Sequence, residues 1–505
     1  MTALPPRLGA GSGPRPEHPA PSAAGILHLG LGNFHRAHQA VYTAAALSAG
    51  GDEWGIVGVA SRSRAVVDAM RAQDLRYTVA EISPIGASFS VPAVHTDAFV
   101  AAEDPERVVG TLADDRIRVV TLTVTEHGYS ASPSTGLLDL NDPLIAADLR
   151  GGAPQTTIGQ LARGLQRRAS GSGTPITILS CDNLSENGAR TEALVRAFLS
   201  ELRGTEGAEA LAYLDSAVAF PSSMVDRIVP ATTPQLRELV AARLGVRDDA
   251  PVSAEPFTMW AIEDRFAAAR PAWEAGGAVF TDEVGAYEQM KVRLLNGTHS
   301  LIAYLGALRG VATISESIAD TAVESAALAI LRDEYEPSVR FPSGVDVRTY
   351  EGQLFERWAN HALGHRTAQV GTDGSVKLRQ RIPEPALRLL EAGSLPHLIA
   401  LTVAAYLSCI APMPGFDPGP HARAMVDPAR EELARLADTS TDGRHLAQRV
   451  IAELHLFGQD LAEQPTFISR VGELIDTIRR HGVDAAIRDS IAASQAPMTT
   501  TGANR

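Results

Sequence analysis

The sequence predicts an α/β fold in two parts, an N-terminal domain built on a mainly parallel sheet and a mostly α-helical C-terminal domain. From Gly25 to about Ser222, short apolar runs alternate with longer stretches rich in Ala, Leu and Arg, which is the pattern of β-α-β units. Beyond about residue 284 the apolar residues follow helical spacing instead. A chain of 505 residues also exceeds what one hydrophobic core usually serves. We therefore expect two folded domains, 24–283 and 284–495, with a boundary near Asp282.

The expected strands are short runs rich in β-branched and aliphatic residues. They are ILHLG at 26–30, GIVGVA at 55–60, VVTLTV at 119–124, PITILS at 175–180 and AVAF at 217–220. Several of them are apolar throughout, as strands are when helices cover both faces of a sheet. In the C-terminal domain the longest apolar stretch, 398–411, is shorter than the roughly 18 to 20 residues that cross a bilayer, so we expect a buried helix there.

Both ends of the chain are expected to lie outside the folded domains. Residues 1–23 carry little but Pro, Gly, Ala and Ser with scattered charge, and they hold no apolar block as long as the central region of a signal peptide. We interpret residues 1–23 as a disordered tail and residues 496–505 as a frayed end.

Composition narrows the class of partner. The net charge of −14 opposes nonspecific attraction to nucleic acid or anionic lipid, and no run of Lys or Arg offsets it. The two cysteines, Cys181 and Cys409, lack the spacing of a disulfide framework or a zinc site, and the 14 histidines show no zinc-ligand spacing such as H-E-x-x-H. We expect a cytoplasmic protein that binds a small molecule, uses no metal, and contacts neither nucleic acid nor membrane.

The segment ILHLGLGNFHRAHQ places two glycines directly after an apolar strand and just before a helix. In that context glycines make the turn tight and let the backbone approach a pyrophosphate at the helix start, so we predict a Rossmann-like NAD(P)-binding domain. The predicted cofactor contacts are the residues of this turn: Gly30, Leu31, Gly32, Asn33 and Phe34. His35 stands where the usual fingerprint has its third glycine, which changes how helix and strand pack. A simple strand-to-helix turn is the alternative.

The end of the second strand bears on the choice of cofactor. An NAD-specific site normally has Asp or Glu there to bind the ribose hydroxyls, whereas this strand is followed by Ser61, Arg62, Ser63 and Arg64. We include Arg62 among the cofactor contacts because an arginine can face the 2′-phosphate of NADP. Solvated surface arginines are an equal alternative, so we expect NAD and leave NADP open.

The segment KVRLLNGTHS carries the candidate catalytic groups. On an α-helix, at about 100° per residue, Asn296 and His299 lie about 140° and 80° from Lys291, so all three share one side. Alcohol oxidation without a metal needs a base for the hydroxyl proton and donors for the developing alkoxide. A lysine of lowered pKa and an asparagine amide can supply them. Gly297 within that face suggests close approach by another group, and an ordinary amphipathic helix is the alternative.

Five motifs in the same order resemble the mannitol dehydrogenase family, also called the polyol-specific long-chain dehydrogenases and reductases. They are GLGNFHRAHQ at 30–39, TLTVTEHGY at 121–129, SCDNLSENG at 180–188, FPSSMVDRIVP at 220–230 and KVRLLNGTHS at 291–300. The resemblance covers most of the chain. It implies a metal-independent oxidoreductase that interconverts a secondary alcohol and a ketone with NAD(P).

The resemblance also implies roles for the residues that carry the chemistry. Lys291 matches the family's general base. Asn296 and Asn187 match the amides that polarise the reacting oxygen. His299 matches a residue that orients the substrate.

Two further carboxylates acquire roles in the same way. Asp226 matches a residue that binds substrate hydroxyls, and Glu126 matches an acid that connects the lysine to bulk water. From the residues alone, Asp226 beside Arg227 could be a local ion pair, and Asn187 before Gly188 could be a turn residue.

A last segment, NHALGHRTAQVGTDGSVKLRQR at 360–381, resembles the fructuronate reductase, or D-mannonate oxidoreductase, branch more than the mannitol 2-dehydrogenase branch. Mannonate carries a carboxylate, and Arg366 or Lys377 could supply a charge-assisted contact to it, although either could instead pair with a nearby acid. The implied substrate pair is D-mannonate and D-fructuronate. The alternatives are D-mannitol and D-fructose, another polyol such as arabinitol and, more remotely, a dinucleotide-binding regulator without catalysis.

Overall fold

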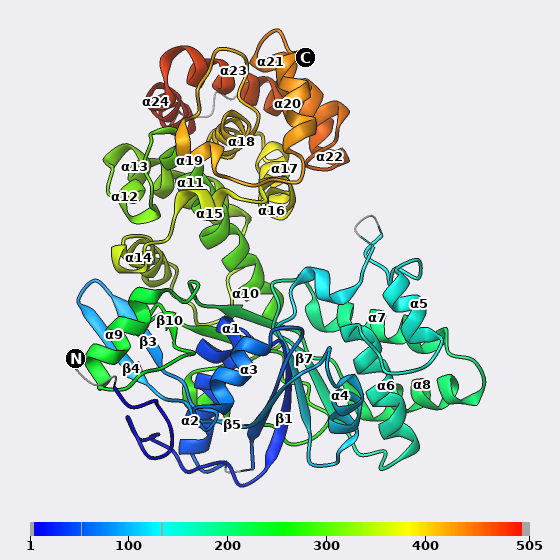
Figure 1. Cartoon of the computed structure of the whole chain (residues 1–505). Helices are drawn as coiled ribbons and strands as arrows, with labels where there is room; N and C mark the ends of the chain where they lie inside the picture. Colours follow the sequence, from blue (N-terminus) through cyan, green and yellow to red (C-terminus); the bar gives the residue numbers. More distant parts are fainter. Residues whose placement is uncertain (1–4, 52, 133–134, 497–505) are drawn as a thin grey trace. The chain divides into compact units, whose positions relative to one another are not determined.

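The computed structural model describes residues 5–51, 53–132 and 135–496, which form two compact units (Figure 1). Unit 1 is Met1–Gly285 and unit 2 is Ala286–Arg505. The division falls inside helix α10 (Val284–Met290). Unit 1 contains helices and three sheets, and unit 2 contains no strand among the residues described.

Unit 1 is built on a six-stranded parallel sheet with the strand order β5-β2-β1-β6-β7-β8. Its strands are β1 (Ala24–Leu29), β2 (Gly55–Ala60), β5 (His95–Val100), β6 (Val119–Leu122), β7 (Ile176–Ser180) and β8 (Val218–Ala219). The order reverses between β1 and β6, and open α/β sheets bind ligands beyond the carboxyl ends of their strands at such a reversal. The predicted Rossmann arrangement, with a helical domain after it, is confirmed.

Helices cover both faces of this sheet, which explains why its central strands are apolar throughout. The covering helices are α2 (Gln39–Ser48), α3 (Arg64–Arg71), α4 (Pro105–Ala113), α6 (Thr157–Ser170) and α7 (Asn187–Ser200). Leu27 and Leu29 of β1 share a core with α4, α6 and α7. Ile26 of the same strand shares another core with α2 and α3. Neighbouring side chains of one strand thus enter different cores, so both must be apolar.

The sequence does not predict one strand of this sheet. β5, with the sequence HTDAFV, lies at the edge, where Thr96 is exposed and Asp97 is half-buried. Asp97 pairs with Arg107 from α4 at this edge. Because edge strands tolerate polar residues, β5 lacks the continuous apolar run that marks its neighbours.

Two smaller sheets complete unit 1, with the strand orders β10-β3-β4 and β12-β11-β9. Their strands are β3 (Val79–Ser83), β4 (Gly86–Ser90), β9 (Ser223–Asp226), β10 (Val252–Ala254), β11 (Met259–Ile262) and β12 (Val279–Phe280). β9 matters for the site because it carries the FPSSMVDRIVP motif and ends at Asp226.

The N-terminal segment differs from the expected disordered tail. Within residues 5–23, Leu8 is buried, its N–H donates to the carbonyl of Arg247 (2.9 Å), and the Arg247 N–H donates to the carbonyl of Pro6 (2.7 Å). The Ala10 N–H also donates to the Asp74 carboxylate (2.9 Å), and Arg7 pairs with Asp249 (3.1 Å). These contacts tie the segment down, and a Pro- and Gly-rich composition does not reveal such anchors. Residues 1–4 and 497–505, which include nearly all of the expected frayed end, lie outside the described residues.

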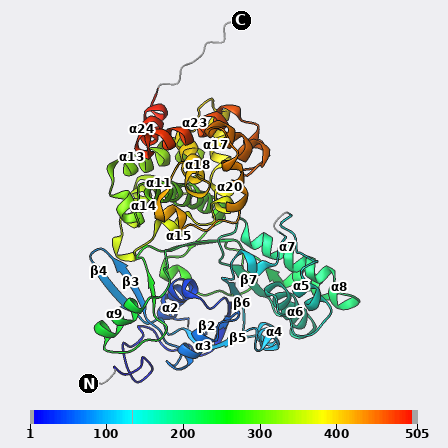
Figure 2. The same cartoon turned by 45° about the horizontal axis from the view of Figure 1, so that its top comes forward.

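Helix α18 (His397–Ile410) forms the interior of unit 2 and confirms the prediction of a buried helix at 398–411, since every residue from Leu398 to Ile410 is buried. In both views it lies among α11 (Thr298–Leu308), α23 (Pro465–His481) and α24 (Val483–Ser494) (Figures 1 and 2). In the part of the chain that the structure describes, no helix has the length and apolar character to span a bilayer.

The buried start of α18 needs acceptors for its free N–H groups. The Glu334 carboxylate accepts hydrogen bonds from the N–H groups of Leu398 and Ile399, each at 2.7 Å. Burial raises the pKa of Glu334 to about 8. One carboxylate from the π-helical turn η4 (Ile330–Tyr335) therefore caps the innermost helix of the unit.

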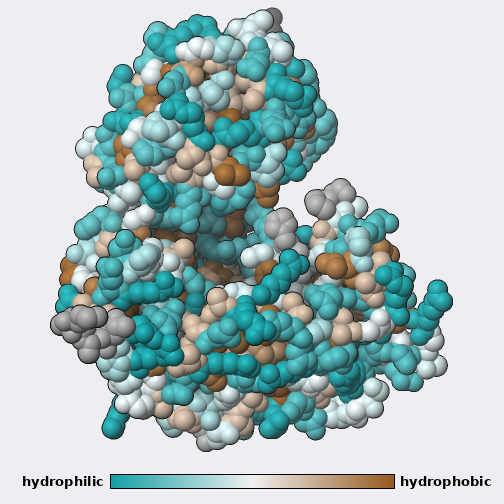
Figure 3. Space-filling view, viewed as in Figure 1, coloured by the Kyte–Doolittle hydropathy of each residue, from teal (hydrophilic) through white to brown (hydrophobic). Residues whose placement is uncertain are grey.

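The surface of each unit is mainly hydrophilic on the face that Figure 3 shows. Ile85, in the turn between β3 and β4, is the most exposed large apolar residue of the described chain, and three exposed leucines lie at 137, 140 and 144. Exposed apolar residues of this kind are ordinary on folded proteins.

Candidate active site

The glycine turn lies at the carboxyl end of β1, where the strand order reverses. Gly30 has φ +110°, and a Cβ there would lie 2.0 Å from the carbonyl oxygen of Thr123, so no other residue fits. Gly32 is exposed, and a Cβ on it would meet nothing nearer than the Gly30 oxygen at 3.7 Å. The turn is therefore closed toward β6 and open on the outer side, which fits the approach of a dinucleotide pyrophosphate.

The other predicted residues of the turn hold its shape. Leu31 is buried, and Phe34 stacks on His38 with ring centroids 5.0 Å apart. The Asn33 amide donates to the hydroxyl of Thr232 (3.2 Å), and its carbonyl oxygen accepts from Arg36 (2.7 Å). These contacts fix the short helix α1 (Asn33–Ala37) that follows the glycines.

His35, in the place of the third glycine, belongs to a buried stack of histidines. Its ring lies on His28 of β1, with centroids 3.4 Å apart, and its Nε2 lies 3.0 Å from the Nε2 of His95. His28 in turn contacts the hydroxyl of Thr121 (2.8 Å) and the Gly30 carbonyl (3.1 Å). Burial lowers the pKa of both His28 and His95 to about 3, so the stack is uncharged at neutral pH.

This stack predicts that unit 1 loses stability in acid. The pKa of each histidine is near 6.5 in the unfolded chain and about 3 in the folded one, so their contribution is complete above pH 6.5 and falls below it. Below pH 6.5 each of these histidines lowers the free energy of unfolding by about 1.4 kcal/mol per pH unit. From pH 7.5 to 5.5 the free energy of unfolding therefore drops by about 3 kcal/mol for His28 and His95 together. Urea unfolding at pH 7.5 and at pH 5.5 measures the drop, and pulsed hydrogen exchange of peptides from β1 and β2 reports the unfolding of unit 1.

The matched variants for this prediction are His95→Gln, within the stack, and His481→Gln, at an exposed position. His95→Gln should reduce the pH dependence by about 1.4 kcal/mol, and His481→Gln should leave it unchanged. Equal unfolding free energies at the two pH values in the parent would show that the stack does not stay uncharged.

The arginines after β2 are not equivalent. Arg64 pairs with Glu103 through bonds of 2.9 and 2.5 Å. Arg62 is exposed, and none of the hydrogen bonds or ion pairs in the described ranges uses its side chain. Arg62 is therefore the one of the two that is free to meet a ligand.

Glu126 lies at the carboxyl edge of the sheet, exposed at the start of the 3-10 turn η1 (Glu126–Tyr129). The loop before it is pinned by Asp182, which follows β7: the Asp182 carboxylate accepts from the N–H groups of Val124 and Thr125, each at 3.0 Å. It also accepts from the Tyr129 hydroxyl (2.9 Å). Burial raises the pKa of Asp182, and the charge of Glu126 adds to the shift. Sequence reasoning missed Asp182, although it lies inside the SCDNLSENG motif.

Asn187, the first residue of α7, is buried and fully bonded within unit 1. Its amide nitrogen donates to the carbonyls of Asp182 (3.0 Å) and Ser223 (2.8 Å), and its oxygen accepts from the Ser223 N–H (2.9 Å). Gly188 permits this contact, since a Cβ there would lie 2.5 Å from the Phe220 carbonyl oxygen. The Asn187 side chain thus ties the end of β7 to the start of β9.

Asp226, at the end of β9, is buried. The neighbouring Arg227 pairs with Glu81 (2.5 Å) and donates to the carbonyls of Glu255 (3.0 Å) and Ala37 (2.6 Å). The guanidinium of Arg227 is thus directed to the Glu81 carboxylate of β3 and to two backbone carbonyls, and this arrangement does not favour a local Asp226–Arg227 pair.

In unit 2 the KVRLLNGTHS segment differs from the expected α-helix. Lys291–Gly297 is a π-helical turn, η3, between α10 and α11 in one continuous helix. Residues five apart lie on the same side of a π-helix, because its hydrogen bonds join i and i+5. Lys291 and Asn296 therefore share one face more closely than the about 140° of an α-helix would allow. π turns frequently occur at functional sites.

The side chain that approaches Gly297 closely is that of Tyr335. A Cβ on Gly297 would lie 2.5 Å from the Cζ of the Tyr335 ring, which is fully buried. Tyr335 ends the second π turn, η4, so the two π turns pack together at this point.

His299 lies one turn further along, buried with Lys291. Its ring contacts His365 (centroids 5.1 Å apart) and Trp358 (6.4 Å), and its Nε2 has no hydrogen-bond partner among the described residues. Burial lowers the pKa of His299 well below its usual value. The charges of His365, Arg381, Arg357 and Lys377 lower it further, in that order.

The two predicted carboxylate-binding residues lie in different surroundings. Lys377, on α16 (Gly374–Arg381), donates to the Thr372 carbonyl (2.7 Å), and its charge, after burial, lowers the pKa of His365 to about 4. Arg366 is exposed at the start of α15 (Thr367–Gly371). The structure thus gathers Lys377, with Arg381 and Arg357, around the His299–His365 pair. Sequence reasoning missed both arginines.

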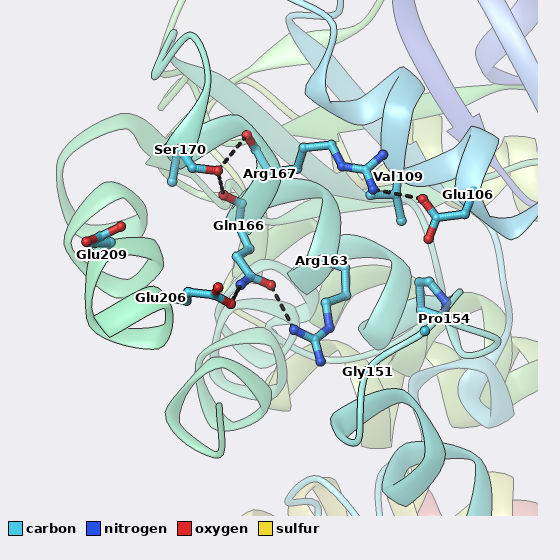
Figure 4. Close-up of a pocket in the computed structure, with 12 residues that line it drawn as sticks. Glu106, Val109, Gly151, Pro154, Arg163, Gln166, Arg167, Ser170, Glu206 and Glu209 are labelled. Carbon is cyan, nitrogen blue, oxygen red and sulfur yellow. Dashed lines mark hydrogen bonds and ion pairs between the residues drawn. The ribbon is translucent and has the colours of Figure 1, made fainter. Parts of the chain in front are cut away.

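One cavity of the described chain lies in unit 1 (Figure 4). It has a volume of about 460 Å³ and lies between α4, α6 and α8 (Thr205–Ala217), and it contains none of the predicted site residues. Several of its polar side chains bond one another: Arg167 pairs with Glu106 (2.7 Å), and Gln166 bonds both Arg163 (2.9 Å) and Glu206 (2.7 Å). This cavity carries no catalytic arrangement. Within the described ranges, no group of three His, Cys, Asp or Glu side chains is placed to hold a metal ion.

Comparisons with known proteins agree with this geometry. Residues 24–275 match the mannitol dehydrogenase Rossmann domain, and residues 283–479 match the mannitol dehydrogenase C-terminal domain. The chain is 36% identical to the D-mannonate oxidoreductase of Escherichia coli, over 93% of this chain and 95% of that protein. It is 35% identical to the mannitol 2-dehydrogenase of Cereibacter sphaeroides, over 93% and 96%.

The ternary complex of Pseudomonas fluorescens mannitol 2-dehydrogenase with NAD and D-mannitol is similar in structure, with a TM-score of 0.82 and 31% identity over 96% of this chain and 99% of that one. The resemblance drawn from the five motifs is confirmed. The chain belongs to the mannitol dehydrogenase family and is an NAD(P)-dependent oxidoreductase.

Proposed function

We propose that the protein interconverts D-mannonate and D-fructuronate, with oxidation at C5 of the sugar acid. The observation that supports this substrate class is the set of positive charges around His299. Lys377, Arg381 and Arg357 all act on that histidine, and a carboxylate would bind favourably in such surroundings. A neutral polyol offers hydroxyl groups that accept hydrogen bonds but no negative charge to pair with them.

We assign the chemistry to the π turn. Lys291, when its amine is uncharged, takes the proton of the substrate hydroxyl at Nζ. The Asn296 amide, on the same face, donates to the oxygen as negative charge develops, and no hydrogen bond within the described residues already uses that amide. His299, uncharged and with a bare Nε2, bonds a further hydroxyl. The nicotinamide cofactor, when bound at the glycine turn, supplies the hydride acceptor.

The roles that we propose for residues of unit 1 follow from the family motifs. Asp226 binds substrate hydroxyls, and Glu126 passes the proton to water. Asn187 reaches a substrate oxygen only by giving up one of its present bonds, so Asn296 is the better placed donor. The bonded Asn187 supports Asp226 through β9.

The test is the initial rate of oxidation of D-mannonate and of D-mannitol, each with NAD and with NADP, in the presence of a chelator. We expect kcat/KM for mannonate to exceed that for mannitol. Lys377→Met should reduce this preference about tenfold or more, since a hydrogen bond to a charged group contributes about 1.5 to 3 kcal/mol. Arg379→Met, at an exposed position of the same helix, serves as the matched control. A preference for mannonate that survives in Lys377→Met would remove Lys377 from the carboxylate site.

The second candidate is a mannitol 2-dehydrogenase or a dehydrogenase of another polyol such as arabinitol. The identity to the Cereibacter enzyme and the similarity to a complex that holds D-mannitol favour it. Turnover of mannitol but not of mannonate would favour this candidate, and no turnover with any pair would point to a polyol other than these two.

Arg62 predicts the response to the second cofactor. The end of β2 offers Arg62 and no carboxylate, so we expect NADP to be accepted beside NAD. Arg62→Met should raise KM for NADP about tenfold, because a charge-assisted bond to the 2′-phosphate is lost, and should leave KM for NAD within about twofold. Arg64→Met, which breaks the pair with Glu103, is the control. Equal effects of the two substitutions would mean that Arg62 is an ordinary solvated side chain.

A further inference from the structure

Arg381, the last residue of α16, makes its bonds to the π turn. Its Nη1 donates to the backbone carbonyl of Asn296 (3.1 Å) and to the hydroxyl of Ser300 (2.7 Å). The Ser300 hydroxyl donates to the same Asn296 carbonyl (3.0 Å). Arg381 is half-buried, and among the described residues no carboxylate pairs with it. A guanidinium without an acidic partner is thus directed at the backbone of the catalytic helix.

The π turn needs support of this kind. A π-helix is rare and short because its wider ring of hydrogen bonds is less favourable than that of an α-helix. Arg381 and Ser300 satisfy the Asn296 carbonyl where η3 meets α11, while the Tyr335 ring fills the space beside Gly297. Relaxation to an α-helix would move Asn296 to about 140° from Lys291 and separate the proposed base from the proposed donor.

We propose that Arg381 is a positioning residue that holds the π turn through the Asn296 carbonyl and the Ser300 hydroxyl, and so keeps Lys291 and Asn296 on one face. The inference rests on the proposed roles of Lys291 and Asn296. Arg381 does not itself touch the reacting atoms.

Because Arg381 is charged, its removal should change the pH dependence of kcat, which a loss of packing alone would not change. It is among the charges that lower the pKa of His299. A positive charge beside the turn also disfavours a protonated amine there. Removing it should therefore move the acid limb of the kcat profile, which reports the base, to higher pH.

The experiment compares Arg381→Met, Arg381→Lys and Ser300→Ala with Arg379→Met, an exposed arginine of the same helix. Arg381→Met should lower kcat about 100-fold, as misplacement by about 1 Å does, with KM for the cofactor unchanged. Its acid limb should move to higher pH. Arg381→Lys keeps the charge and should restore the pH profile and part of kcat. Ser300→Ala removes one anchor without changing charge and should lower kcat at an unchanged profile.

Hydrogen–deuterium exchange of peptides spanning 291–300 tests the anchor without any substrate. Exchange should be faster in Arg381→Met and in Ser300→Ala than in the parent, and unchanged in Arg379→Met. If exchange does not change, the anchor is refuted whatever the enzyme's substrate. If the parent turns over none of the substrates but exchange rises as expected, the proposed function fails and the anchor stands. A kcat for Arg381→Met within about threefold of Arg379→Met would overturn the positioning role.

Discussion

Lys291→Ala is expected to lower kcat for alcohol oxidation by about 10² to 10⁴, which is the usual contribution of a positioned general base. Lys291 is 7% exposed on the π turn, so its side chain is held in one place and water does not easily replace it. KM for the cofactor should not change, because the predicted cofactor contacts are those of the glycine turn and Arg62, and Lys291 is not among them. Initial rates and cofactor titration of the purified variant measure both quantities.

A second variant and a rescue experiment test this prediction further. Lys291→Arg keeps a positive charge but cannot give up its proton at neutral pH, so it should be as inactive as the alanine variant. Small primary amines added to Lys291→Ala should restore part of the rate by taking the place of Nζ. An arginine variant with near-normal kcat would show that the charge matters and the proton transfer does not.

Gly30→Ala is expected to abolish cofactor binding and to lower the free energy of unfolding of unit 1 by about 3 kcal/mol or more. The backbone of Gly30 lies at φ +110°, and the added Cβ would lie 2.0 Å from a carbonyl oxygen of the neighbouring loop, so the backbone itself must move. NADH titration and urea unfolding measure the two effects.

Gly32→Ala is the matched control. It lies in the same turn, but its Cβ would meet only the Gly30 oxygen, at an ordinary contact distance of 3.7 Å, and its φ of −105° is accessible to alanine. We expect its folding cost to stay below about 1 kcal/mol. Equal destabilisation by the two substitutions would mean that the turn tolerates a side chain at Gly30 by shifting β6.

The features predicted from the sequence are those that local pattern determines. The order of apolar runs and the glycines after β1 are sufficient for a Rossmann sheet, because burial on both faces and a tight turn each impose their own residues. β5 is not predicted from the sequence, because an edge strand can carry polar residues such as Thr96 and Asp97.

The remaining features depend on contacts distant in sequence. Whether KVRLLNGTHS forms an α turn or a π turn depends on Tyr335 and Arg381, which lie 38 and 85 positions beyond Gly297 and Asn296. The same apolar residues would suit either helix, so periodicity cannot distinguish them. The bonds that occupy Asn187 likewise come from Ser223, 36 positions away.

The tryptophans have an optical consequence. Of the four in the chain, Trp54, Trp260 and Trp273 belong to unit 1, and Trp358 is the single indole of unit 2. Trp358 is buried beside His299, with its Nε1 unbonded among the described residues. Indole emission depends on the polarity and hydrogen bonding around the ring. The helical unit therefore carries its own chromophore at the proposed catalytic histidine, and with the other three indoles replaced it could be observed without a dye or a tag.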